Sequence, residues 1–416
     1  MRHIFKTTAL TGLLACAAVS AQAATTVEFW HSFKGASGEV LDGIIAEFEA
    51  ANPGIDIEAS YIGNYNDIVA KLQAAIPARR APDAVILEVT RYGLFADRGV
   101  LAELDGYLEA DPLRDDLFGF AREVGVYQGK TWIVPFNSST PVLYVNKAVF
   151  AEAGMEEIPD LGDFDAILAA AQTVQQSLGD DGISGIAAPG QFARWGLIMA
   201  NDSDLIDSVS GDILIDAPET VEAYEWMASL VSGHGVASVD GVTEEDNGRD
   251  AFLAGKVGMM MNSTGNFRSA KTALGEDLAV LPMPCNRACS VPIGGAGIGI
   301  LSSAEAEVQQ AAWRFISYAA GAESNAKWFA GTGYMPINRN TAAQPVAAAA
   351  LEQEPGITVA IGQLDVARGR PRPPVVTWMR ASEYDVWQAM ALGQREVAPA
   401  LEDFAARTRA EAARTN

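Results

Sequence analysis

The sequence predicts an α/β fold with room for two lobes, and three observations carry this prediction. The chain has 416 residues, more than a single lobe of ordinary size needs. Hydrophobic residues make up 49% of it and charged residues 20%, which is the balance of a globular protein. Short apolar strands alternate with amphipathic helices along the chain, which is typical of a mainly parallel sheet flanked by helices.

The alternation begins directly after a basic and apolar leader. Apolar strands, helical spacing of apolar residues and a helix stop at Asn52-Pro53-Gly54 define the first units. We expect strands at 26–30, 55–61 and 83–89, with helices at 40–48 and 66–75.

Later segments continue the pattern. Further strand-containing units are expected around 141–151, 182–187, 257–261 and 294–301, and C-terminal helices at 304–319, 382–392 and 398–412. Because ligands of open α/β sheets bind beyond the carboxyl ends of strands, the loops after the strands should form the site.

Charge excludes two classes of partner. Acidic residues outnumber basic ones 53 to 29, giving a formal net charge of -24. Such a surface repels phosphate backbones and anionic lipids, so we expect neither a nucleic-acid nor a membrane-surface role.

Residues 1–23 resemble a secretory signal peptide. Basic residues open the segment, an apolar stretch follows, and Ala21-Gln22-Ala23 fits the small-residue cleavage rule. Two alternatives are a buried N-terminal helix and lipoprotein processing at Cys16. The expected product is exported and soluble, in the periplasm.

The three cysteines are too few for a disulfide scaffold or a cysteine-rich metal site. Cys285 and Cys289 share a polar loop, and export to an oxidising compartment makes a local disulfide plausible. Zinc binding lacks further ligands nearby, and a redox-active pair would have the tighter Cys-x-x-Cys spacing.

Signals for catalysis are weak. His31 and His234 belong to no nucleophile–base or zinc pattern, so no catalytic residue, metal or cofactor is expected. The glycines of 294–299 superficially resemble a dinucleotide loop, but no helix opens after them. A close backbone approach to a small ligand is the favoured interpretation.

Six loops combine hydroxyl, amide, aromatic and cationic side chains, the mixture that ligand pockets use. They are Trp30-His31-Ser32, Gly63-Asn64-Tyr65, Asn137-Ser138-Ser139-Thr140, Asn262-Ser263-Thr264-Gly265, Thr332-Gly333-Tyr334 and Trp378-Met379-Arg380. Each alone is ordinary turn chemistry.

Several longer motifs carry a resemblance over nearly the whole chain after residue 23. They are Phe29-Trp30-His31-Ser32, Ala51-Asn52-Pro53, Gly63-Asn64-Tyr65, Asn137-Ser138-Ser139-Thr140-Pro141-Val142-Leu143-Tyr144, Phe252-Leu253-Ala254-Gly255-Lys256, Ile293-Gly294-Gly295-Ala296 and Thr332-Gly333-Tyr334-Met335-Pro336-Ile337. With them the sequence resembles the periplasmic glycerol-3-phosphate-binding proteins of ABC importers, within family 1 of the extracellular solute-binding proteins.

The resemblance implies two α/β lobes around a hinge, a small molecule held between them, and delivery to the membrane permease subunits by a monomer. It also implies repeated crossings of the hinge. The first lobe is then 24–138 with 282–335, and the second is 139–281 with 336–416.

The same resemblance implies the ligand-binding residues. They are Tyr65, Ser139, Ser263, Gly295, Tyr334 and Arg380, which match the family's ligand contacts. An arginine fork suits phosphate oxygens, and hydroxyls and a backbone N–H add donors.

Two positions depart from the family pattern. The family loop Val-Tyr-Glu-Val-Gly aligns with Val89 to Gly93, so Arg91 stands where the family has Glu and is expected to change the ligands accepted. An alternative is that Arg91 pairs with Asp97 or Glu88 and only shapes the wall. The family's pocket tryptophan falls on Phe192 or Trp195.

The sequence therefore predicts a binding protein for glycerol 3-phosphate or a glycerophosphodiester such as glycerophosphocholine. The rivals are a sugar or oligosaccharide binder on the same fold and a secreted phosphodiesterase. Two arginines facing the ligand would argue against the first, and a metal cluster or acid–base pair would indicate the second.

Overall fold

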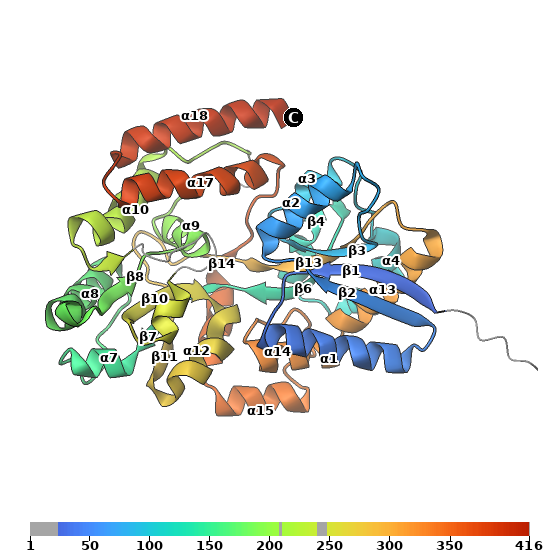
Figure 1. The fold of residues 1–416 in the computed structure, drawn as a ribbon, viewed down its shortest axis with the longest axis horizontal. Helices are drawn as coiled ribbons and strands as arrows, with labels where there is room; N and C mark the ends of the chain where they lie inside the picture. The colour runs from blue at the N-terminus through green and yellow to red at the C-terminus, as the bar shows by residue number, and fades with distance from the viewer. Residues whose placement is uncertain (1–23, 208–209, 239–247, 416) are drawn as a thin grey trace, which may run out of the picture.

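A computed structural model describes residues 24–207, 210–238 and 248–415. Two lobes lie side by side, each built on its own five-stranded sheet (Figure 1). The expected signal peptide at 1–23, with Cys16, lies outside the described residues. No helix within the described ranges has the length and apolar character needed to cross a bilayer.

The first lobe contains a mixed sheet in the order β2-β1-β3-β13-β6. Its strands are β2 (Ile55–Tyr61), β1 (Thr25–His31), β3 (Ala84–Glu88), β13 (Gly294–Ile300) and β6 (Val134–Ser139). β1 runs parallel to β2 and β3, whereas β13 runs antiparallel to β3 and β6.

The second lobe repeats the arrangement in the order β11-β7-β10-β8-β9. Its strands are β11 (Leu278–Leu281), β7 (Pro141–Asn146), β10 (Val257–Ser263), β8 (Ser184–Ala187) and β9 (Ala237–Ser238). β8 pairs in parallel with β10 and β9, and β7 pairs antiparallel with β10 and β11. Both sheets are thus mixed, with a smaller parallel share than the apolar runs predicted.

Helices cover both sheets. Around the first lie α1 (Ala36–Ala51), α2 (Tyr65–Ala75), α3 (Gly93–Ala96), α4 (Asp105–Glu109), α5 (Leu113–Asp116), α6 (Gly119–Val124), α13 (Ala306–Ala320) and α14 (Ala322–Thr332). The other helices are α7 (Lys147–Glu152), α8 (Phe164–Leu178), α9 (Gln191–Ala200), α10 (Pro218–Ala228), α11 (Arg249–Leu253), α12 (Phe267–Leu274), α15 (Pro345–Gln353), α16 (Gly356–Gly362), α17 (Val375–Ala391) and α18 (Val397–Thr415).

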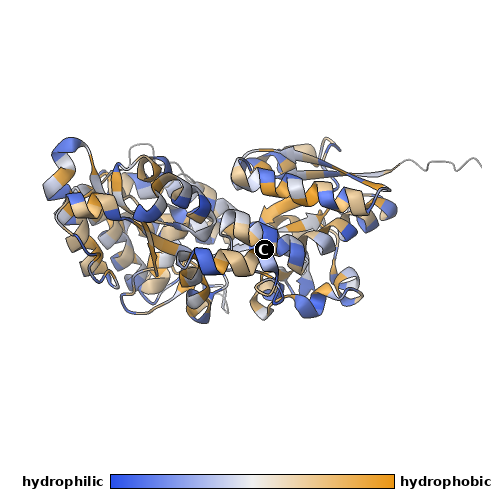
Figure 2. Cartoon of the chain, turned by 90° about the horizontal axis from the view of Figure 1, so that it is seen from below, coloured by the Kyte–Doolittle hydropathy of each residue, from blue (hydrophilic) through white to orange (hydrophobic). Residues whose placement is uncertain are grey.

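Each lobe has its own hydrophobic core. One core joins β1, α1 and α13 through residues such as Phe29, Phe48 and Phe315. The other joins β7, α9 and α17 through residues such as Val145, Trp195 and Trp387. Figure 2 shows hydrophobic colour on the strands inside the lobes and mixed colour on the outer helices, as expected for layers that bury one face.

The chain crosses between the sheets more than once. β6 and β7 follow each other in sequence but lie in different sheets, and the segment between β11 and β13 makes the return. β12 (Val291–Pro292), on the second of these connections, pairs in parallel with β14 (Ala367–Arg368), which precedes α17. A hairpin of β4 (Val126–Tyr127) and β5 (Lys130–Thr131) lies apart. The predicted boundaries between the lobes follow residues 138, 281 and 335. They concern which residues move together as one lobe, and they stay a prediction.

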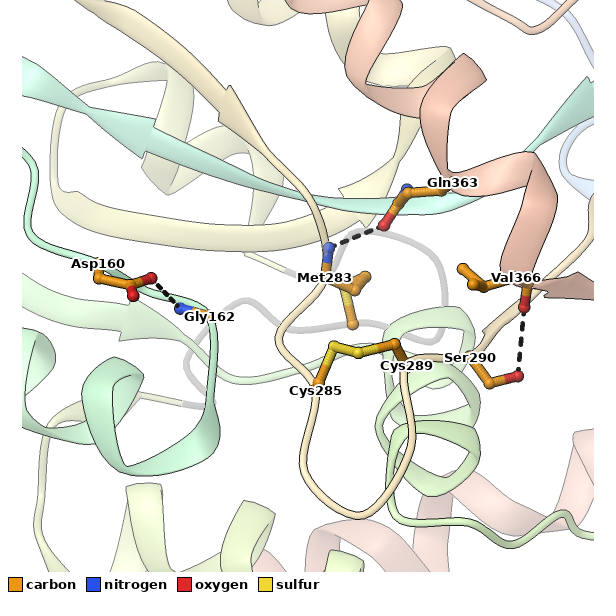
Figure 3. Close-up of a disulfide and its surroundings, with 8 residues drawn as sticks. All are labelled: Asp160, Gly162, Met283, Cys285, Cys289, Ser290, Gln363 and Val366. Carbon is orange, nitrogen blue, oxygen red and sulfur yellow. Dashed lines mark hydrogen bonds between the residues drawn. A yellow bond between two sulfur atoms is a disulfide. The ribbon is translucent and has the colours of Figure 1, made fainter.

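The disulfide between Cys285 and Cys289 is present in the second connection (Figure 3). The loop that it closes is anchored on the second lobe, because Cys285 N donates to Gly162 O and Ala288 N donates to Ala200 O. The disulfide therefore closes a loop of this interlobe connection on the side of the second lobe.

Candidate functional site

A cavity of about 160 Å³ lies where the lobes meet. Thirteen residues line it: Tyr65, Glu88, Ser139, Gln191, Phe192, Asn262, Ser263, Asn266, Gly294, Gly295, Tyr334, Arg370 and Arg380. They come from the ends of β3, β6 and β10, the start of β13, and the helices around them. The carboxyl ends of strands thus supply part of the site, as the loop argument predicted.

Tyr65 is positioned by the start of α2. Asn64 Oδ1 accepts from Asp67 N at 2.9 Å, and Asp67 Oδ2 accepts from Asn64 N at 2.9 Å. This capping box satisfies two backbone donors and holds the first helical residue, Tyr65, at the cavity wall.

Ser139, Gly294 and Gly295 lie side by side across two paired strands. Gly294 pairs with Ser139, and Gly295 pairs with Ser138. A Cβ on Gly294 would lie 2.6 Å from Phe192 Cζ and 2.7 Å from Ser139 Oγ. Glycine at this position therefore keeps the cavity open.

Ser263 and Tyr334 form another part of the wall. Ser263 ends β10, and its Oγ accepts from Gly265 N at 3.1 Å. Tyr334 follows Gly333, which ends α14 with a φ of 89°, and its ring stacks on Trp328 with centroids 5.8 Å apart. The left-handed glycine turns the chain so that Tyr334 leaves the helix and reaches the cavity.

Glu88, the last residue of β3, is surrounded by three arginines. Arg370 Nη2 donates to Glu88 Oε1, Arg380 Nη1 lies 2.8 Å from Glu88 Oε2, and Arg91 Nε lies 3.8 Å from the same oxygen. All four residues are buried, with exposed fractions between 3% and 8%. Glu88 therefore has a cation on several sides.

The charge states of this cluster follow from burial and pairing. Burial by itself would raise the pKa of Glu88, but Arg370, Arg380 and Arg91 overcome it and hold the pKa well below its ordinary value. Burial lowers the pKa of Arg370 to about 10 despite the opposing effect of Glu88. Arg370 therefore remains cationic and Glu88 anionic at neutral pH.

Arg370 lies over two aromatic rings of α9. Its guanidinium carbon lies 5.0 Å from the ring centroid of Phe192 and 5.1 Å from that of Trp195. Arg370 Nε donates to Ile293 O at 3.1 Å, whereas Nη1 is buried and has no hydrogen-bond partner in the described part of the chain. The cation is thus fixed in place with a donor to spare.

Arg380 is oriented from the second lobe. Its Nε donates to Gln191 Oε1 at 2.6 Å, and Gln191 Nε2 donates to Glu383 Oε2 at 3.1 Å. Glu383 also accepts from Arg194 Nε at 2.7 Å, which makes a buried pair behind the cavity. Because Arg380 Nη1 also donates to Thr90 Oγ1 at 3.0 Å, this side chain links the two lobes.

A wider cleft adjoins the cavity. It measures about 680 Å³ and shares Tyr65, Asn266 and Tyr334 with the cavity wall. Its other walls come from 32–37 of the first lobe and from Arg268 and Ser269 of the second. A ligand with a second substituent would find room there.

Seven of the nine residues expected at the site line the cavity: Tyr65, Ser139, Phe192, Ser263, Gly295, Tyr334 and Arg380. The structure thus brings together residues that are hundreds of positions apart in sequence. Their role in ligand binding remains a proposal, taken up below.

Arg91 is not among the lining residues, so the expectation that it faces the cleft is corrected. The chain turns immediately after β3, with Arg91 N donating to Glu88 O at 2.9 Å, and the side chain packs beside Glu88. The alternative pairing with Glu88 is the one observed. The acidic side chain in the cavity wall at this end of β3 is that of Glu88.

Trp195 does not line the cavity either. It lies one turn beyond Phe192 on α9, is 1% exposed, and donates from Nε1 to Asp204 Oδ1 at 2.7 Å. Of the two aromatic candidates, Phe192 is therefore the wall residue, and Trp195 supports Arg370 from outside the cavity.

Arg380 lies inside a helix and not in the expected loop. Proline at 373 and 374 precedes α17, which runs without a breaker from Val375 to Ala391. The helix thus begins seven residues before the predicted start at 382, because proline at a helix N-terminus favours initiation.

Sequence reasoning missed six lining residues: Glu88, Gln191, Asn262, Asn266, Gly294 and Arg370. Asn262 and Gly294 lay within motifs already singled out, and Glu88 had been considered only as a partner of Arg91. For Arg370 the only signal was its place in Arg368-Gly369-Arg370-Pro371-Arg372.

Among the described residues, no group of three or more His, Cys, Asp or Glu side chains is placed to hold a metal ion. The chemistry of the cavity instead comes from guanidinium, hydroxyl, amide and carboxylate groups, which can bind and orient a polar anion.

The sequence and the fold are both similar to those of known transport proteins. The profile of the family described as bacterial extracellular solute-binding protein matches residues 43–357. The sn-glycerol-3-phosphate-binding periplasmic protein UgpB of Escherichia coli strain K12 is 30% identical over 340 residues, covering 77% of this chain and 76% of that protein.

Two solved structures share the fold. UgpB from Mycobacterium tuberculosis in complex with glycerophosphocholine superposes with a TM-score of 0.84 at 22% identity, covering 93% of this chain and 98% of that one. The GacH receptor of Streptomyces glaucescens, solved unliganded and with acarbose, superposes with a TM-score of 0.82 at 22% identity, covering 93% and 98%.

Proposed function

The chain belongs to the bacterial extracellular solute-binding proteins, the non-enzymatic binding components of ABC importers, and we propose that its ligand is a phosphate ester of glycerol. The candidates are glycerol 3-phosphate and a glycerophosphodiester such as glycerophosphocholine. The ligand would occupy the cavity between the lobes.

The observation that carries this proposal is the pair of arginines in the cavity wall. Arg370 and Arg380 both line it, and among the residues that the structure describes Glu88 is the single acidic one that does so. Guanidinium groups in a buried site bind phosphate oxygens through two parallel hydrogen bonds. An anionic ligand would therefore neutralise charge that Glu88 leaves unbalanced.

The remaining wall suits a glycerol moiety. Tyr65, Ser139, Ser263 and Tyr334 provide hydroxyls, and Asn262 and Asn266 provide amides. Such groups donate to and accept from the hydroxyls of a polyol, whereas the Phe192 ring offers an apolar surface for its carbons. The relatives named UgpB support the same ligand class.

The proposal includes a place of action. Family members act outside the cytoplasm, and the leader at 1–23 supports export to the periplasm. There the protein would capture its ligand as a monomer and deliver it to the permease subunits of an importer.

A sugar is the second candidate, favoured by the fold shared with the acarbose-binding GacH receptor. The cavity argues against it, because a neutral sugar would leave two buried arginines partly uncompensated. Arg91 was expected to be the second cation that faces the ligand. The second arginine in the cavity wall is instead Arg370.

A ligand screen tests the proposal. Glycerol 3-phosphate, glycerophosphocholine and maltose are added separately to the purified protein, and the melting temperature is followed. A ligand at a hundred times its Kd stabilises the folded state by about 2.7 kcal/mol, which raises the melting temperature by several degrees. A rise with maltose and none with either phosphate ester would overturn the proposal.

A further inference from the structure

We infer that Gly265 is a positioning residue of the cavity. Because it has no side chain, the ring of Tyr334 can lie against it from the other lobe and form part of the cavity wall. The ligand side of this inference rests on the proposed function. Gly265 itself does not line the cavity, and it matches none of the ligand contacts that the sequence predicted.

The first support is the lack of space at Gly265. A Cβ at this position would lie 2.4 Å from Tyr334 Cζ, 2.7 Å from Cε2 and 2.8 Å from Cε1. Such distances are well below van der Waals contact, so any side chain here would displace the ring. Gly265 does not have a positive φ, so its backbone conformation would accept alanine. The ring of Tyr334 is therefore what calls for glycine.

The second support is the packing of the Tyr334 ring within the first lobe. The ring stacks on Trp328 with centroids 5.8 Å apart and 20° between the planes, and it meets Phe33 edge-on at 6.4 Å. Trp328 and Phe33 are both buried members of the first lobe's core. A displacement of the ring would therefore also disturb aromatic packing in that core.

The third support is a matching close approach at Gly333, the residue before Tyr334. A Cβ on Gly333 would lie 2.7 Å from Phe267 Cβ and 3.0 Å from Thr264 O. The turn after α14 and the turn after β10 thus meet with a glycine on each side. The position of Tyr334 therefore depends on the second lobe as well as on its own.

This contact lies beside the connection between the lobes. Met335 N donates to Ser138 O at 2.8 Å, and Thr264 N donates to Thr140 O at 3.0 Å. Residues next to a hinge move less than distant ones when two lobes rotate about it. The contact of Tyr334 with Gly265 should therefore be present without ligand as well as with it.

The place of Tyr334 gives the contact its consequence for binding. Tyr65, Asn266 and Tyr334 line both the cavity and the wider cleft, so they lie at the boundary between the two spaces. Gly265 lines only the wider cleft. A side chain at 265 would thus change the shape of the cavity at this boundary without replacing any group in its wall.

The experiment is a double-mutant cycle on the full chain with Gly265→Ala, Tyr334→Ala and the variant that carries both. Calorimetric titration with glycerol 3-phosphate and with glycerophosphocholine gives the affinities, and thermal unfolding without ligand gives the melting temperatures. The control is Gly362→Ala. Gly362 ends α16 of the second lobe with a φ of -61°, is exposed, and has no neighbouring group within 4 Å of an added Cβ.

Gly265→Ala should weaken binding of the ester that the unmodified protein binds by about tenfold or more, and it should lower the melting temperature. In the Tyr334→Ala background the same substitution should change the affinity by less than about twofold and leave the melting temperature unchanged, since the ring is absent. Gly362→Ala should leave the affinity within about twofold of that of the unmodified protein.

The double variant also decides the case in which Gly265→Ala does not fold. It should then fold as Tyr334→Ala does, because removal of the ring restores the space that the added methyl group needs. A double variant that fails to fold while Tyr334→Ala folds would overturn the inference.

The outcomes separate the inference from the proposed function. If the unmodified protein binds an ester but Gly265→Ala binds it unchanged, or if Gly265→Ala has equal effects with and without the ring, the inference is wrong. If the unmodified protein binds neither ester, the proposed function fails. The melting temperatures then decide the inference alone: a decrease that requires Tyr334 supports it, and no decrease, or one that persists without the ring, overturns it.

Discussion

Arg380 and Glu88 form an ion pair between the two lobes. We expect loss of the Arg380 side chain to affect ligand affinity and loss of the Glu88 carboxylate to affect stability. Arg380 lines the cavity from α17 and is paired with Glu88 and Thr90 of the first lobe. If the ligand is the proposed phosphate ester, removing this guanidinium takes a charge-assisted contact away from its phosphate.

Arg380→Ala should therefore weaken binding of a glycerol phosphate ester by about 2–5 kcal/mol, which is a loss of about thirtyfold or more. Calorimetric titration measures it, with Arg395→Ala as the control because Arg395 is an exposed cation beyond α17. Near-unchanged affinity would remove Arg380 from the site.

The ionisation of Glu88 should make the free energy of unfolding depend on pH in the acidic range. Its folded-state pKa lies below the ordinary value of about 4.3 for an unfolded chain, since three arginines outweigh burial. Its contribution is therefore complete above that value and is lost as pH falls toward the folded-state pKa.

Glu88→Gln should lower the free energy of unfolding of the unliganded protein by about 3–5 kcal/mol at pH 7, because it leaves buried arginines unpaired. The difference from the unmodified protein should narrow below about pH 4. Urea denaturation at pH 7 and at lower pH measures it, and exposed Glu58→Gln serves as the control at pH 7. A difference that grows with acid would contradict the assignment.

The residue scale also shows where a motif alone misleads. Glu88 and Arg91 are three positions apart, and the motif drew attention to Arg91, whereas Glu88 is the one that lines the cavity. Only the position of Glu88 at the end of β3 places its carboxylate in the cavity, while the following turn takes Arg91 beside it. Side-chain direction at a strand end depends on the register of the sheet.

Among the elements, β13 depends on glycine. Gly295 has a φ of 111°, and an added Cβ would lie 2.2 Å from the backbone oxygen of Asn137. Gly43, in contrast, is exposed in α1 with nothing within 4 Å of an added Cβ.

Gly295→Ala should thus destabilise the protein by about 1–3 kcal/mol or more, through backbone strain and the close contact with β6. Gly43→Ala should stabilise it by about 0.5–1 kcal/mol, because alanine loses less backbone entropy in a helix. Chemical denaturation of both variants checks the pair, and equal effects would be inconsistent with the backbone geometry of β13.

The disulfide between Cys285 and Cys289 should contribute little to stability. Its short span constrains the unfolded chain little, so replacing both Cys285 and Cys289 by serine should cost about 2 kcal/mol or less. The melting temperature should fall by only a few degrees. A collapse of the fold would show that the loop anchored at Gly162 and Ala200 matters more than its length indicates.

At the scale of the whole molecule, the cavity takes its wall residues from both lobes. A ligand that contacts both lobes at once would favour a form in which they are closed around it.

Solution scattering should therefore give a smaller radius of gyration with saturating ligand than without it. Arg380→Ala, which lacks a cross-lobe contact, should show a smaller change at the same ligand concentration. An unchanged curve for the unmodified protein at confirmed saturation would count against hinge closure.

Local patterns in the sequence were sufficient for the alternating elements, because amphipathic spacing, turn residues and buried apolar runs act over a few residues. The motifs Asn137–Tyr144 and Thr332–Ile337 likewise indicated the family, which the comparisons confirm.

Tertiary structure alone decided the sheet directions, the joining of Arg370 to Glu88, and the separation of Phe192 from Trp195. Glu88 and Arg370 are 282 positions apart, and no local propensity records that the chain brings them together. Charge balance in a buried site is a sum over such distant neighbours. The sequence therefore determined which chemical groups are present, and the fold determined which of them share a cavity.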